Sequence, residues 1–127
     1  MRKKIFFWTA LFWTGVITFF CLEPSNNLPK FSIPNLDKFV HAFFHFVFTL
    51  LWFLFLKKQM KKRDKFKPLI TALVLSFIFG MSIEVLQELC TSTRKADLMD
   101  ILANVSGAML AFVSMLFLKK SKCLEKI

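Results

Sequence analysis

Four long runs of apolar residues, separated by short polar stretches, dominate the pattern of the chain. The runs cover residues 5–22, 37–56, 68–90 and 98–118. Each is close to the length that an α-helix needs to cross the roughly 30 Å hydrocarbon core of a bilayer. Backbone amides must be paired within the segment when hydrocarbon surrounds them, which favours helices. The pattern therefore predicts an all-α integral membrane protein: one domain over residues 1–127, built as a compact bundle of four transmembrane helices.

The first run, Ile5–Leu22, follows three basic residues, as a secretory signal also would. Its apolar stretch is longer than the roughly 7–15 residues typical of a signal peptide. Phe19 and Phe20 precede Cys21, where a lipoprotein acylation site would need small residues, and no small-residue cleavage site follows. We therefore expect an uncleaved first transmembrane helix.

Basic residues are concentrated on one side of the predicted bundle. The chain has 18 Lys+Arg against 8 Asp+Glu, a net charge of +10. Three basic residues precede the first run, seven lie at 57–67 and four in the tail, whereas the other side holds Lys30, Lys38, Arg94 and Lys95. Because cytoplasmic loops are enriched in Lys and Arg, both termini and the 57–67 loop are predicted to be cytoplasmic. The basic loop then faces anionic lipid, and no nucleic acid partner is expected.

Polar residues gather at the opposite, outer end of the predicted bundle. Three of the helices carry them at positions three or four apart, which lie on one helical face. They are Asp37, His41 and His45; Glu84, Gln87 and Glu88; and Asp97, Asp100 and Asn104. An ionisable side chain in hydrocarbon is costly, so we expect these faces to point into the bundle. The spacing predicts an outward-facing polar pocket that reaches roughly 10 Å below the helix ends.

Glu84 has two interpretations. It is either a clamp between helices, satisfied by Arg94, Asn104 or His41, or part of a ligand or proton-transfer site. A clamp alone would not need polar residues on three helices, which favours the site. Arg94 and Lys38 would bind an anionic group there, since a guanidinium suits bidentate contact with phosphate or carboxylate.

The same residues also suggest possible metal binding and catalysis. Zinc binding by His41 and His45 with Glu84 and Glu88 is the metal alternative, but the HExxH string is absent from the sequence. His45 is more simply a helix-packing histidine with a local hydrogen bond, and we expect no metal and no cofactor. No Ser or Cys stands beside a base in a nucleophile motif, which disfavours covalent catalysis. Acid/base catalysis by His41, Glu84 and Asp100 stays open.

Two patterns have structural interpretations. Asp37 and Asp97 precede helical runs and can cap them. Gly107 and Ala111, four residues apart, predict a close contact between helices.

The chain carries DKFVHAF at 37–43, followed later by E-x-x-Q, an Arg and D-x-x-x-N-x-x-G. This combination resembles the VanZ-like family of small bacterial membrane proteins. The matching positions are Asp37, Lys38, His41, Glu84, Gln87, Arg94, Asp100, Asn104 and Gly107. Two positions depart from the family pattern: His45, where an aromatic residue is frequent, and Ala111, where Gly is frequent. The resemblance implies a multi-pass protein of the bacterial cytoplasmic membrane, linked to resistance against the lipoglycopeptide teicoplanin.

Two functions follow as predictions. In the favoured one, the polar residues at the positions that match the family pattern bind or shield an anionic lipid or lipid-linked envelope precursor. In the alternative, the protein is a membrane-embedded enzyme acting by acid/base chemistry on such a lipid. A transporter is less favoured because four helices leave little room for alternating access, unless the chain forms a homo-oligomer, which the sequence leaves open.

Overall fold

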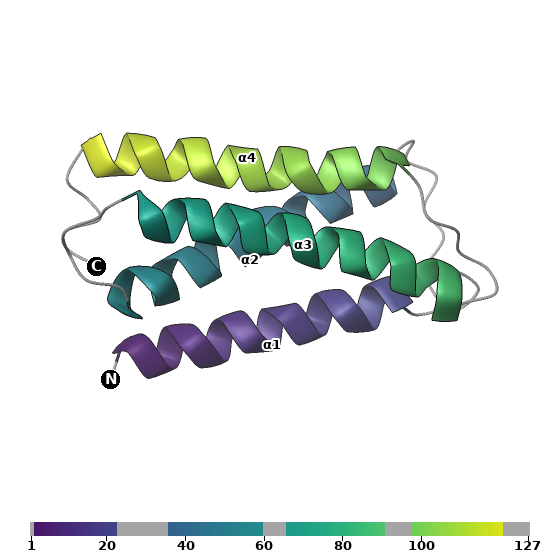
Figure 1. Ribbon diagram of the computed structural model, residues 1–127, viewed down its shortest axis with the longest axis horizontal. Helices are drawn as coiled ribbons and strands as arrows, with labels where there is room; N and C mark the ends of the chain where they lie inside the picture. Colours follow the sequence, from purple (N-terminus) through teal and green to yellow (C-terminus); the bar gives the residue numbers. More distant parts are fainter. Residues whose placement is uncertain (1, 23–35, 60–65, 91–97, 121–127) are drawn as a thin grey trace.

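The protein is a bundle of four α-helices, given by a computed structural model that describes residues 2–22, 36–59, 66–90 and 98–120 (Figure 1). The helices are α1 (Arg2–Leu22), α2 (Leu36–Gln59), α3 (Lys67–Cys90) and α4 (Leu98–Lys120). Each is long and apolar enough to span a membrane, and the described ranges contain no strand. The predicted all-α membrane architecture is confirmed.

The helices extend past the apolar runs into their polar flanks. For example, α1 begins at Arg2 and α2 ends at Gln59. An apolar run marks the part of a helix that lies in hydrocarbon, whereas Lys, Arg and Gln can continue the helix into the headgroup region. Because α2 begins at Leu36, Asp37 lies in its first turn. The Asp37 side chain and all of Asp97 lie outside the described residues, so their capping roles stay predictions.

α2 is the central helix of the bundle. It packs against the three other helices, while α1 contacts α2 and α3 in the described part of the chain. Consecutive helices run in opposite directions, so the carboxyl ends of α1 and α3 meet the amino ends of α2 and α4 (right side of Figure 1). We call this the polar end of the bundle, because His41, Glu84 and Asp100 lie near it.

Apolar contacts fill the rest of the interior in two clusters. One, away from the polar end, consists of Phe53, Leu69, Ala72 and Met115. The other consists of Ile17, Cys21, Phe48 and Ile83, and there the rings of Phe48 and Phe79 stack with centroids 4.8 Å apart. Large apolar side chains cover the outside of all four helices, as at Phe12, Phe43, Phe77 and Leu110. This outer surface is suited to acyl chains rather than to water.

Small residues let α2 and α4 approach closely. A Cβ on Gly107 would overlap the backbone carbonyl oxygen of Ala42 and lie 2.7 Å from its carbonyl carbon. Ala111, one turn further along α4, is fully buried. The close contact predicted from Gly107 and Ala111 is thus confirmed, and it fixes the register between α2 and α4.

The orientation of the bundle in the membrane is a testable prediction from the basic residues. In a chain lacking its native cysteines, Ser25→Cys should react with a membrane-impermeant thiol reagent in intact cells. Ser121→Cys should react only after the cells are broken, because the fourteen basic residues on its side of the protein predict a cytoplasmic location. Labelling of Ser121→Cys in intact cells, with Ser25→Cys protected, would reverse the orientation.

Candidate functional site

The polar faces predicted from residue spacing lie inside the bundle. Their buried members are His41, His45, Glu84, Gln87, Asp100 and Asn104. The expectation that these faces point into the bundle is confirmed for these six. Among the members whose side chains the structure describes, Glu88 is the exception, because it is exposed. The inward arc of α3 passes through Gly80, Ile83 and Gln87, and Glu88 lies beyond its edge, two residues before the helix ends.

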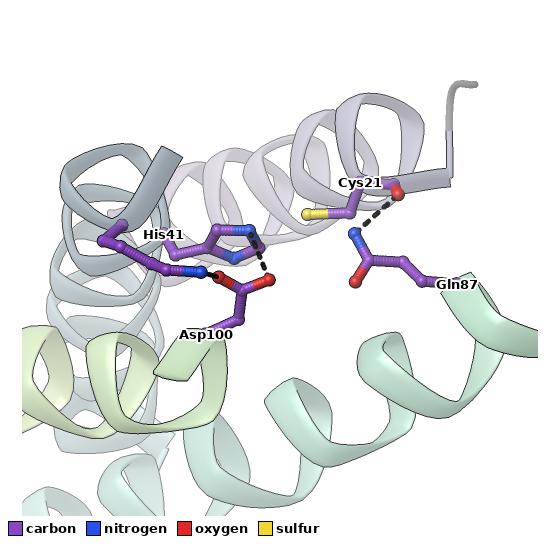
Figure 2. A network of polar contacts seen from close by, with 5 residues as sticks. Cys21, His41, Gln87 and Asp100 are labelled. Atoms are coloured by element: carbon purple, nitrogen blue, oxygen red, sulfur yellow. Dashed lines mark hydrogen bonds and ion pairs between the residues drawn. The ribbon is translucent and has the colours of Figure 1, made fainter. Parts of the chain in front are cut away.

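An ion pair joins α2 to α4 at the polar end. The Lys38 ammonium donates a hydrogen bond to Asp100 Oδ1, and the other carboxylate oxygen, Oδ2, lies 3.8 Å from His41 Nε2 (Figure 2). Lys38 and His41 are three residues apart and so share a face of α2. Asp100 lies in the first turn of α4, where the helix dipole also favours a negative charge. The side chains of Lys38 and Asp100 are 23% and 13% exposed, so the pair is partly accessible.

Glu84 completes a cluster that draws on three helices. One ring nitrogen of His41 and one carboxylate oxygen each of Glu84 and Asp100 lie within 4.8 Å of one another. We call these three residues the acid-histidine cluster. Glu84 is 1% exposed and lies six residues before the end of α3, roughly 9 Å below it at the usual helical rise. The cluster therefore brings together the three residues predicted as acid/base candidates.

Asn104 lies one turn of α4 beyond Asp100, on the same face. It is 3% exposed, and neither its Oδ1 nor its Nδ2 has a hydrogen-bond partner among the described residues. A Cβ on Gly80 would lie 3.0 Å from Asn104 Nδ2 and 3.1 Å from His45 Cε1. Gly80 thus makes room for both side chains between α3 and its neighbours. Sequence reasoning missed this role, although a glycine one turn before Glu84 on an apolar helix was a usable signal.

His45 lies one turn beyond His41 on α2, and its hydrogen bonds are to residues outside the acid-histidine cluster. Its Nδ1 is 2.8 Å from Ser76 Oγ on α3, and Thr49 Oγ1 donates to the His45 carbonyl oxygen at 2.7 Å. The interpretation of His45 as a helix-packing histidine with a hydrogen bond is confirmed. Zinc binding by His41 and His45 with Glu84 and Glu88 finds no support, since Glu88 is exposed and Ser76 holds the His45 ring.

Gln87 connects the carboxyl ends of α3 and α1. Its Nε2 donates to the backbone carbonyl oxygen of Cys21 at 2.8 Å (Figure 2). This bond gives Gln87, predicted as a ligand-binding residue, a structural contact. Arg94 and the Asp37 side chain lie outside the described residues, so their places in the site stay predictions.

These features define a class: a multi-pass membrane protein of four helices, with a cluster of buried ionisable residues at one end of the bundle. The comparison with protein families agrees with this description. A family model described as VanZ/LLP1 matches residues 6–119, and the chain belongs to this family. Neither the comparison with curated proteins nor that with solved structures finds a match.

Proposed function

We propose that the protein binds the anionic headgroup of a membrane lipid or lipid-linked envelope precursor at the polar end of the bundle. The observation that carries this proposal is the Lys38–Asp100 pair, which holds a partly accessible ammonium at the rim of the acid-histidine cluster. An ammonium has three N–H donors, so the same group can contact Asp100 and an anion together. Arg94, six residues before Asp100 in the sequence, would add a second cation.

The position of the pair suits a lipid ligand. Lys38 and Asp100 are each in the first turn of a helix, close to the level at which headgroups meet hydrocarbon. A headgroup could reach Lys38 there while its acyl chains stay along the apolar outer surface. On the predicted orientation, this level is in the outer leaflet of the cytoplasmic membrane. Envelope precursors and acyl-anchored glycopeptides also meet there, which agrees with the link of VanZ-like proteins to teicoplanin.

An enzyme remains the second candidate, because an imidazole and two carboxylates lie within 4.8 Å of one another. His41 could accept or supply a proton in such a reaction, with Glu84 and Asp100 orienting it or stabilising its charge. The two candidates differ in what His41 must do. Binding through Lys38 does not require a titrating imidazole, whereas acid/base catalysis does.

The test compares strains that express equal membrane levels of the wild type, Asp100→Asn, His41→Ala and an exposed-residue control, Glu88→Gln. We expect the wild type and the control to raise resistance to teicoplanin severalfold, with no change for vancomycin, which lacks the acyl anchor. Asp100→Asn should abolish the effect, because Lys38 loses its anchoring carboxylate.

The His41→Ala strain separates the two candidates. Retained teicoplanin resistance supports binding or shielding. A new membrane lipid product that appears with the wild type and is lost with His41→Ala supports the enzyme. Equal growth and equal lipids in wild-type and empty-vector strains would contradict both.

A further inference from the structure

We propose that His41, Glu84 and Asp100 bind one divalent metal ion of the Mn²⁺, Fe²⁺ or Zn²⁺ type. The site would lie between α2, α3 and α4, with one ligand from each helix. One imidazole with two carboxylates is a donor set that suits these ions, since it mixes nitrogen with hard oxygen ligands. This inference does not depend on lipid binding, because it concerns the protein alone.

The geometry is close to what a metal ion requires. The three ligand atoms lie within 4.8 Å of one another. Metal–ligand bonds of about 2.0–2.2 Å place neighbouring ligand atoms roughly 3–3.5 Å apart. Small side-chain rotations would close this difference, and the three helices already hold the ligands on facing sides. The three ligands come from separate helices, so the sequence contains no compact motif such as HExxH for this set.

Electrostatics favours a cation at this point. The Glu84 and Asp100 carboxylates approach each other inside an apolar bundle, where two negative charges would repel. A divalent ion between them offsets both charges at once. The Lys38 ammonium, which is partly exposed, lies on Asp100 Oδ1, whereas Asp100 Oδ2 faces His41. Lysine and metal would therefore occupy different oxygens of the same carboxylate.

Asn104 gives independent support for a ligand in this part of the bundle. Its amide is almost fully buried, and neither polar atom of the amide has a hydrogen-bond partner among the described residues. Burying an amide in this way costs free energy unless another group contacts it. Asn104 lies one helical turn after Asp100 on α4. Its amide approaches Gly80, which lies one turn before Glu84 on α3. A metal ion, or water bound to it, would supply the contact from the neighbouring cluster.

The test titrates MnCl₂ into the purified full-length chain, without a polyhistidine tag and without added lipid, and measures free Mn²⁺ by electron paramagnetic resonance. We expect one Mn²⁺ per wild-type chain. Loss of an outer-shell partner alone typically weakens metal binding about 10–100-fold, so Glu84→Gln and His41→Gln should weaken it about tenfold or more. The matched control is Glu88→Gln, because Glu88 is an exposed carboxylate one turn away on α3. This variant should bind Mn²⁺ like the wild type.

The Lys38→Gln variant should give a result that would not be expected if the acid-histidine cluster only stabilised the fold. Removing a positive charge beside the cluster should tighten Mn²⁺ binding severalfold, while the proposed binding of an anionic headgroup should weaken. Far-ultraviolet circular dichroism establishes that each variant is folded, and if Glu84→Gln does not fold, His41→Gln decides. Absence of stoichiometric Mn²⁺ binding to the wild type would overturn the site, as would equal weakening by Glu88→Gln. Neither result would affect the proposed lipid binding, which the resistance experiment tests separately.

Discussion

Gly107→Ala should lower the free energy of unfolding by about 3 kcal/mol, the upper part of the range for an overpacked interior. The added Cβ would overlap the carbonyl oxygen of Ala42 and lie 2.9 Å from its Cα. These are backbone atoms of α2, so no side chain can rotate away to make room. The two helices would have to separate, which would also move Asp100 on α4 relative to Lys38 and His41 on α2.

Gly15→Ala is the matched control for this prediction. A Cβ at Gly15, in the middle of α1, would meet nothing within 4 Å. Since Gly in a helix interior costs roughly 0.5–1 kcal/mol relative to Ala, this variant should be as stable as the wild type or slightly more stable. Thermal unfolding of both variants in the same detergent, followed by circular dichroism, provides the comparison. Equal stability of Gly107→Ala and the wild type would contradict the close contact between α2 and α4.

The second large effect is expected at the ion pair. Lys38→Met should destabilise the bundle by about 2 kcal/mol, because it leaves the Asp100 carboxylate largely buried without this ammonium. That is less than the roughly 3–5 kcal/mol of a fully buried pair, since water reaches part of this one. The double variant Lys38→Met/Asp100→Asn should recover much of the loss, because the remaining amide carries no charge.

A double-mutant cycle measures this coupling, with unfolding followed in excess chelator so that no divalent ion contributes. The two single variants and the double variant are compared with the wild type. Additive effects of the two substitutions would show that Lys38 and Asp100 act independently. In that case the rim of the acid-histidine cluster would have to be reassigned.

The helices and the inward faces could be predicted because the bilayer constrains them strongly. Apolar length determines the spans, and the cost of a buried charge directs Glu84 and Asp100 inward whatever the details of packing. The prediction was wrong for Glu88. Residues 84, 87 and 88 together cover a wide arc of a helix, and spacing alone does not say where the buried arc ends.

Contacts between helices were harder to predict, because they depend on how far each helix is shifted along its neighbours. The spacing of residues along α2 allows either His41 or His45 to face Asp100. Asp100 is the third residue of α4, at the level of the first turns of α2, and so it meets His41. His45 lies one turn deeper and meets Ser76. The atoms that a side chain at Gly80 or Gly107 would meet lie on neighbouring helices, so the sequence of one helix does not identify them.

The bond from Gln87 to the Cys21 carbonyl has a consequence for the order in which the chain is assembled. Cys21 is among the last four residues of α1, whose carbonyl oxygens have no amide donor within the helix. Gln87, 66 residues later and near the end of α3, donates to this carbonyl oxygen through its side chain. During synthesis, the carboxyl end of α1 can therefore reach its final state only after α3 has entered the membrane. The same event brings Glu84, one turn before Gln87, to the level of His41.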